Sequence, residues 1–268
     1  MARLVLFAKG NLDLRDSLHS LIIGDQLLWN GLNEIVRARF PGTTIRLRHE
    51  TWTRSDALLA SAGDVPLELA ERSLALGAYS LPSQFSQSLF ETDADAYILS
   101  LQPDISNFLF RHRVEGYLFC PNNFEGWPIE DQHWLRQNFV EAAPLDVEQS
   151  MRNFESMIER LRARRHAPIL IYNLSAVVPG EWVHTYKGLA ETYSTRIRQF
   201  NLGLIELSRR TGISIVDVDT IVARGGADRL KIDTLHLTAE GCRLVAEEVV
   251  QILEDLGLLT PAELQPCV

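Results

Sequence analysis

Short apolar runs alternate along the chain with longer segments that carry a helical stripe of apolar positions. The runs are four to six residues long and comprise Leu4–Phe7, Thr44–Leu47, Tyr97–Leu101, Pro168–Asn173 and Ile213–Val218. Short apolar strands that alternate with helices are typical of a parallel sheet covered by helices on both faces. The pattern therefore predicts an α/β fold.

The segments between these runs carry start and stop signals for helices. Asp146 and Gln149 have the spacing of a capping box at the start of an amphipathic stripe. Thr238 is a good N-cap for a helix that runs to Gly257, and Gly212 is placed to end the preceding one. The helices are thus expected to begin and end close to these residues.

Two stretches, 53–92 and 106–145, are less periodic than the rest of the chain. The second is rich in aromatic residues, which more often form the small core of an insertion than the wall of a ligand pocket. No linker-like or repetitive segment separates either stretch from its surroundings. We therefore expect one domain over residues 1–268 with insertions at about 53–92 and 106–145.

Composition narrows the class of protein. The chain has 268 residues, 46% of them hydrophobic, which is enough for a sizeable core. Its net charge of −9 argues against binding to nucleic acid or to anionic membranes. No window reaches the roughly 18 apolar residues that a membrane-spanning helix needs. Cys120, Cys242 and Cys267 form no CxxC pair, which favours a reducing, cytoplasmic location without a disulfide framework or a zinc site.

Polar residues that follow the predicted strands are the candidates for chemistry, because ligands of open α/β sheets bind at the carboxyl ends of the strands. Gly10 and Asn11 follow the first run, and Asn173 and Ser175 follow the fourth. Asn173 and Ser175 are interpreted as substrate contacts or, alternatively, as caps of a loop. No spacing of ligand residues indicates a metal site, and no cofactor is expected.

Asp233 and His236 lie three residues apart, directly before the last predicted helix. A carboxylate at this distance can hydrogen-bond one imidazole nitrogen and fix the tautomer, which leaves the other nitrogen free to act as a general base. An exposed turn with a charge at a helix N-terminus would explain the same spacing.

This segment, "DTLHLTAEG", resembles the last block of the SGNH/GDSL hydrolases, a DxxH motif followed by a helix. The similarity extends backward through the Phe200-Asn201 pair to a strand that ends in Asp217, and "DAYILSLQPDIS" occupies the place of the family's third block. The resemblance implies a flavodoxin-like, three-layer α/β/α sandwich. It also implies serine-based cleavage or transfer of an ester or acyl group on a small metabolite, sugar or lipid, with His236 as base and Asp233 as its partner.

The position of the nucleophile stays open in this comparison. The family's serine follows a Gly-Asp pair at the end of the first strand. If Gly10-Asn11 holds that place, the nucleophile position is Leu12, which has no reactive group. If the tripeptide "DSL" is the motif, Ser17 is the nucleophile after a detour of eight residues. Ser20 is a third alternative, and the Leu12 alternative amounts to a site without a serine nucleophile.

Asp104 stands where the resemblance places the asparagine of the oxyanion hole. An ionised carboxylate there would repel an oxyanion unless burial kept it protonated. Two hypotheses follow from these residues. The first is a serine hydrolase or acyltransferase that uses Ser17, Asp233 and His236. The second is an SGNH-fold protein without the serine, which is either a non-covalent acid/base enzyme using His236 and Asp104, with Asp13 or Asp16 as a further carboxylate, or a ligand-binding relative.

Overall fold

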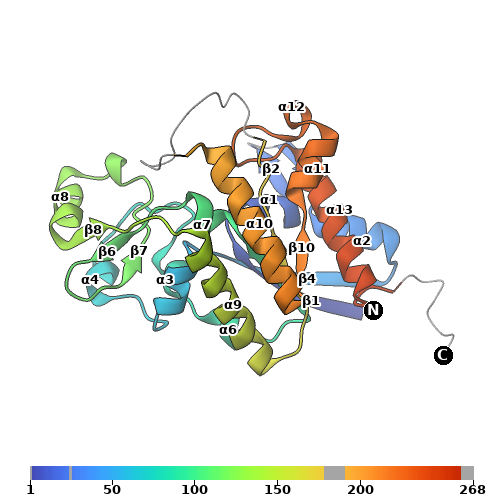
Figure 1. Cartoon of the computed structure of the whole chain (residues 1–268), viewed down its shortest axis with the longest axis horizontal. Coiled ribbons are helices and arrows are strands. Elements are labelled where there is room, and N and C mark those ends of the chain that lie inside the picture. The colour runs from blue at the N-terminus through green and yellow to red at the C-terminus, as the bar shows by residue number, and fades with distance from the viewer. Residues whose placement is uncertain (1, 24–25, 178–190, 261–268) are drawn as a thin grey trace.

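The computed structural model describes residues 2–23, 26–177 and 191–260. Its centre is a parallel sheet of five strands in the order β10-β9-β5-β1-β4 (Figure 1). The strands are β1 (Ala2–Gly10), β4 (Thr43–Thr51), β5 (Ala96–Ser100), β9 (Ile169–Tyr172) and β10 (Ser214–Val216). Each lies on one of the predicted apolar runs, so the predicted parallel sheet is confirmed.

Helices cover both faces of the sheet, because successive side chains of a buried strand point to opposite sides. Leu4, Leu6 and Ala8 of β1 belong to one core cluster, and Phe7 belongs to the other. The first face is covered by α1 (Leu12–Leu18), α2 (Leu32–Arg39), α11 (Val218–Gly225), α12 (Ala227–Leu230) and α13 (Ala239–Asp255). The second face is covered by α3 (Ser55–Ala60), α6 (Ser88–Glu91), α7 (Gln102–Ser106), α9 (Val147–Arg164) and α10 (Tyr193–Thr211). The three-layer α/β/α arrangement is confirmed.

The capping residues act as the sequence predicts. The Asp146 side chain accepts from the Gln149 amide at 2.7 Å in a complete capping box at the start of α9. Thr238 accepts from the amide of Gly241 at the start of α13. Gly212 ends α10 with φ 66°, a conformation that favours glycine. These caps fix where the long helices begin and end.

The less periodic stretches pack together beside the main sheet, at the left of Figure 1. The second stretch forms a small antiparallel sheet of β6 (Phe110–His112), β7 (Leu118–Phe119) and β8 (Phe139–Glu141), with α8 (Ile129–Asn138). The first contributes α4 (Leu67–Ala70) and α5 (Leu81–Phe85). Their shared core joins Leu69 and Phe85 to aromatic residues of the second stretch. The aromatic residues of the second stretch thus form a small core of their own with residues of the first.

Between α1 and α2 the chain forms a hairpin of β2 (Leu21–Ile23) and β3 (Gln26–Trp29). Among the described residues, no helix combines the length and apolar character that a membrane crossing requires. Cys120 and Cys242 are buried and form no disulfide, and Cys267 lies outside the described residues.

Candidate active site

Asp233 and His236 form a hydrogen-bonded pair in the loop between α12 and α13. The carboxylate of Asp233 accepts from the backbone amides of Leu235 at 2.8 Å and His236 at 2.9 Å. Its Oδ2 also lies 2.8 Å from Nδ1 of the His236 ring. Burial tends to raise the pKa of Asp233, but these hydrogen bonds together outweigh it and lower the pKa. The loop therefore holds an ionised carboxylate against Nδ1.

The other ring nitrogen of His236 is left for a substrate or water. No hydrogen bond to Nε2 is found among residues 2–23, 26–177 and 191–260, and the His236 side chain is 38% exposed. A carboxylate on Nδ1 favours the tautomer in which that nitrogen carries the proton, so that Nε2 can accept one.

Lys231 fixes the same loop from inside the protein. Its buried ammonium donates to the carbonyl oxygens of Val177 at 2.6 Å and Thr234 at 2.8 Å. Burial lowers the pKa of Lys231 to about 8, against the opposing effect of the Asp233 and Asp219 charges. The lysine is therefore mostly cationic at neutral pH and ties the loop that carries the Asp–His pair to the segment that follows β9.

A small, partly open cavity of about 20 Å³ lies against this loop. A volume of this size has room for about one water molecule. The cavity is lined by Asp13, Gln102, Tyr172, Asn173, Leu174, Ser175, Val218, Lys231, Thr234, Leu235 and Leu237. Residues from the carboxyl ends of β1, β5 and β9 meet there, which is where open α/β sheets bind ligands.

Asp13 places a partly buried carboxyl group in the cavity wall. Ser100, the last residue of β5, donates to Asp13 Oδ2, and the amide of Gln102 donates to the Ser100 hydroxyl at 3.0 Å. The other oxygen, Oδ1, is shielded from solvent and has no hydrogen-bond partner among the described residues. Burial raises the pKa of Asp13 to about 6, although the Ser100 hydroxyl and the amides of Leu14 and Asn11 oppose the rise.

Ser17 lies on the inner side of α1 and is fully buried. Its hydroxyl donates to the carbonyl oxygen of Asp13 at 2.6 Å, and the Tyr172 hydroxyl lies 3.2 Å away. The serine proton is thus used within its own helix, as happens to serines inside helices. This placement disfavours Ser17 as nucleophile. Leu12 is the first residue of α1, and the Ser20 hydroxyl donates to Asn30 on the surface.

Asp104 lies on α7 and does not line the cavity. Its fully buried carboxylate accepts from the amide of Ser55 at 2.7 Å, from the Ser55 hydroxyl at 2.5 Å and from the Ser150 hydroxyl at 2.6 Å. Burial raises the pKa of Asp104 to about 6 against these bonds. Asp104 thus joins α7 to α3 and α9, and Gln102 is the residue of this segment that lines the cavity. This placement disfavours the expected oxyanion role of Asp104.

The remaining predicted binding residues divide into two groups. Asn173 and Ser175 line the cavity, and Asn173 also donates to Asp217 at 2.8 Å. Gly10 and Asn11 do not line the cavity, and Asn11 accepts from the hydroxyl of the half-buried Tyr79 at 2.8 Å. Asn173 is therefore at once a cavity residue and a structural link between β9 and the segment after β10.

Ser100, Tyr172 and Lys231 are cavity or supporting residues that the sequence reasoning missed. Ser100 and Tyr172 each end a strand of the sheet, and this position is the signal that could have found them. Lys231 follows α12 and gives no comparable signal, since its burial depends on distant contacts.

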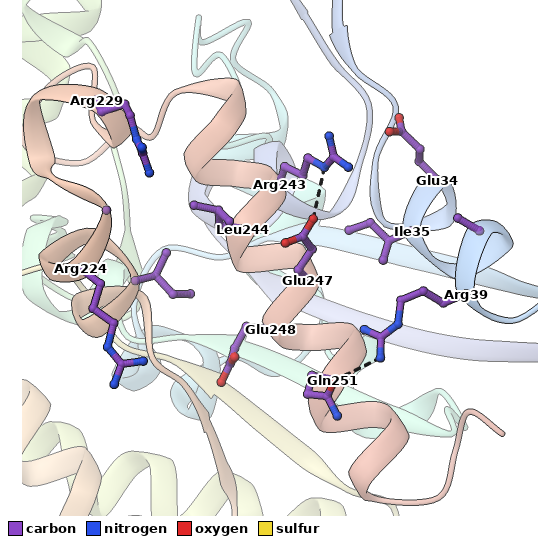
Figure 2. A pocket seen from close by; sticks show the side chains of 13 residues that line it. Glu34, Ile35, Arg39, Arg224, Arg229, Arg243, Leu244, Glu247, Glu248 and Gln251 are labelled. Atoms are coloured by element: carbon purple, nitrogen blue, oxygen red, sulfur yellow. Dashed lines mark hydrogen bonds and ion pairs between the residues drawn. The ribbon is translucent and has the colours of Figure 1, made fainter. Parts of the chain in front are cut away.

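A larger groove of about 770 Å³ lies elsewhere, along α13 between α2 and α11 (Figure 2). Arg243 pairs with Glu247 at 3.2 Å in it, and Arg39 donates to Gln251 at 3.1 Å. None of the cavity residues around Asp13 lines this groove. Its exposed arginines are interleaved with glutamates, so it has no net preference for an anion.

Comparison with known proteins shows that other proteins share this fold, but it shows no closer relationship. No protein-family model and no curated protein matches the sequence. Solved structures do match over nearly the whole chain. The lipase/acylhydrolase from Enterococcus faecalis has a TM-score of 0.52 at 14% identity, covering 97% of this chain and 98% of its own. A member of the lipolytic G-D-S-L family from Veillonella parvula has a TM-score of 0.50 at 11% identity, covering 94% and 99%.

An acetyl-xylooligosaccharide esterase from Geobacillus stearmophilus is similar in the same way, with a TM-score of 0.51 at 11% identity, covering 95% of this chain and 94% of its own. The chain therefore has the fold of the SGNH/GDSL hydrolases, and the resemblance seen in the sequence is confirmed for the fold. At this level of identity the comparison does not extend to the reaction or the substrate.

Proposed function

We propose that this protein hydrolyses an ester or acyl bond of a small metabolite, sugar or lipid, with water in place of a serine as the nucleophile. The observation that carries the proposal is the His236–Asp233 pair, held at 2.8 Å beside a cavity at the carboxyl ends of the strands. The solved structures with this fold include esterases and a lipase, which supports the bond type.

The pair has the geometry that proton transfer needs. Asp233 holds Nδ1 of His236, so the ring can take up or release a proton at Nε2 while the carboxylate stabilises the imidazolium form. The half-exposed ring lies at the outer side of the loop, whereas Thr234 and Leu235 face the cavity. We therefore assign His236 to the leaving group of the substrate, which would lie at the solvent-exposed end of the site.

Lys231 supplies positive charge for the developing oxyanion. Its ammonium has three N–H donors, and two of them are directed to Val177 and Thr234. No acceptor for the third is found among the described residues, and the lysine lines the cavity. A fixed cation in an enclosed site stabilises negative charge more strongly than it would in water.

Water is the proposed nucleophile because Ser17 is enclosed and its proton is directed to its own helix. An acceptor alcohol in place of water would turn the same site into an acyltransferase. A cytoplasmic location remains a prediction from the cysteine pattern, and the proposal adds no partner other than the small-molecule substrate.

Kinetics of matched variants test the proposal. The purified protein is assayed with p-nitrophenyl acetate, an acetylated sugar and a short-chain lipid ester. His236→Gln should lower kcat/KM by about 100-fold or more, because general acid/base catalysis contributes about that much. Ser17→Ala should retain activity within about tenfold, since the hydroxyl supports the backbone of Asp13 but touches no reacting atom.

Loss of activity in Ser17→Ala with the fold intact would restore the serine mechanism. Absence of turnover by the unaltered protein on all three substrates would contradict the proposal as a whole.

A further inference from the structure

We infer that Asp13 binds the attacking water through Oδ1 and removes its proton during hydrolysis. The inference rests on the proposed function, and it gives Asp13 the role of base that the sequence resemblance assigns to His236. It depends on three features of the cavity: an oriented carboxylate, an unpartnered oxygen and a space of suitable size.

The carboxylate of Asp13 is held in one orientation from two sides. Ser100 donates to Oδ2, and the amide of Gln102 donates to the Ser100 hydroxyl at 3.0 Å, which directs the serine proton toward Asp13. The backbone of Asp13 is held as well, because the Ser17 hydroxyl donates to its carbonyl oxygen at 2.6 Å. A carboxylate held by its neighbours in this way needs little further free energy to adopt its reactive geometry.

Oδ1 of Asp13 is the unpartnered atom of this arrangement. It is shielded from solvent, and no donor within the described part of the chain makes a hydrogen bond of normal distance and angle to it. The amides of Leu14 and Asn11 lower the pKa of Asp13 without reaching that geometry. A buried carboxylate oxygen without a donor is costly, so native structures usually supply a protein group or an ordered water. The adjoining cavity of about 20 Å³ has room for one water. One water on Oδ1 would satisfy the carboxylate and occupy the cavity.

The surroundings of Asp13 suit a base at neutral pH. Burial raises its pKa to about 6, which is close to the value at which a carboxylate is both ionised and basic. The titratable groups that face it are Asp16 on α1, Tyr79, Tyr172 on β9 and Cys242 on α13. Burial raises the pKa of both tyrosines and of the cysteine, so these three stay neutral near pH 7. Asp16 adds negative charge, and Lys231, which lines the same cavity, adds positive charge.

The proposed step balances as ordinary ester hydrolysis. The water oxygen forms a bond to the acyl carbon while one water proton passes to Asp13 Oδ1. The bond from the acyl carbon to the leaving oxygen then breaks, and protonated His236 gives that oxygen a proton from Nε2. The proton on Asp13 passes to solvent and His236 takes one up, so the products are a carboxylic acid and an alcohol.

Asp13→Asn tests the role, with Asp16→Asn as its matched control. Asp16 lies on the same helix and pairs with Arg15 at 2.7 Å, and it does not line the cavity. We expect Asp13→Asn to lower kcat by about 100-fold with little change in KM, and to abolish the fall in rate below about pH 6. The control should stay within about threefold of the original protein.

Ser100→Ala provides a second test, which does not remove the carboxylate. The Ser100 hydroxyl lowers the pKa of Asp13, so its loss should move the acid limb of the rate profile to higher pH while the plateau is kept. A merely structural serine would lower the rate at every pH. This pH profile also tests whether Asp13 acts as the base if Asp13→Asn does not fold.

A single turnover in water labelled with heavy oxygen separates two chemistries of Asp13. If Asp13 activates water, the label enters the acid product and the peptide that contains residue 13 stays unlabelled. Label in that peptide would show a covalent acyl-Asp13 intermediate and overturn the inference. Retention of activity by Asp13→Asn would overturn it as well. Retention by His236→Gln, with loss in Asp13→Asn, would instead refute the assigned role of His236 and leave Asp13 in place.

Discussion

Replacing Asp104 with asparagine separates a structural role from a role in the active site. The Asp104 carboxylate is fully buried and accepts three hydrogen bonds, two from Ser55 and one from Ser150. An asparagine of nearly the same shape can still accept from the Ser55 amide, and the two hydroxyls can turn to accept from its NH₂ group. The substitution therefore removes the titration of residue 104 and keeps the packing.

The size of the effect follows from the change in the pKa of Asp104 on folding. Burial raises it from 3.8 to about 6, so the folded protein binds the proton more tightly than the unfolded chain does. The stability that this proton provides is fully present below about pH 4 and is lost as the pH rises through about 6. A rise from 3.8 to about 6 corresponds to roughly 3 kcal/mol of unfolding free energy.

The assay is urea unfolding at about pH 4 and about pH 7.5 for both proteins. The loss of stability between these two values should be smaller by roughly 3 kcal/mol in Asp104→Asn, because Asp13 titrates equally in both and cancels. Exposed Asp64→Asn serves as the control and should leave the pH dependence unchanged. An unaltered pH dependence in Asp104→Asn would refute the reasoning, and loss of activity in the folded variant would return Asp104 to the active site.

Two other substitutions test the close packing and the loop of the site. Gly10→Ala would place a Cβ atom 2.4 Å from Leu14 Cδ1 and 2.8 Å from Ser100 Cβ, so α1 must move. We expect the free energy of unfolding in urea to fall by about 1–3 kcal/mol, together with a lower kcat. An unchanged midpoint of unfolding would contradict the packing argument. Lys231→Met removes the buried ammonium group and with it the two hydrogen bonds to Val177 and Thr234. Hydrogen exchange at residues 232–236 should then be faster by about tenfold, whereas unchanged exchange would show that the lysine does not order the loop.

The parts of the site that are local in sequence could be predicted. Asp233 and His236 are three residues apart in one loop, so their spacing alone indicated a hydrogen bond, and the structure has it at 2.8 Å. The capping box of Asp146 and Gln149 is local in the same sense. The strands could also be predicted, because a strand buried on both faces is apolar at nearly every position.

The parts that depend on distant contacts could not be predicted. Ser100 and Asp13 are 87 residues apart, and only the adjacency of β1 and β5 brings them together. The direction of Ser17 depends on the phase of α1, which turns its hydroxyl toward Asp13 and Tyr172. The Asp104 side chain is directed away from the cavity, because its hydrogen-bond donors lie on α3 and α9. A motif alignment places such residues along the chain, but the packing decides which way they face.

The measurement that tests the central claim most directly is the intact mass of the protein after incubation with a fluorophosphonate, compared with that of Ser17→Ala. The account predicts no mass increase in either protein, while the original protein turns over p-nitrophenyl acetate. A stoichiometric adduct on the original protein that maps to Ser17 and is absent from Ser17→Ala would contradict it.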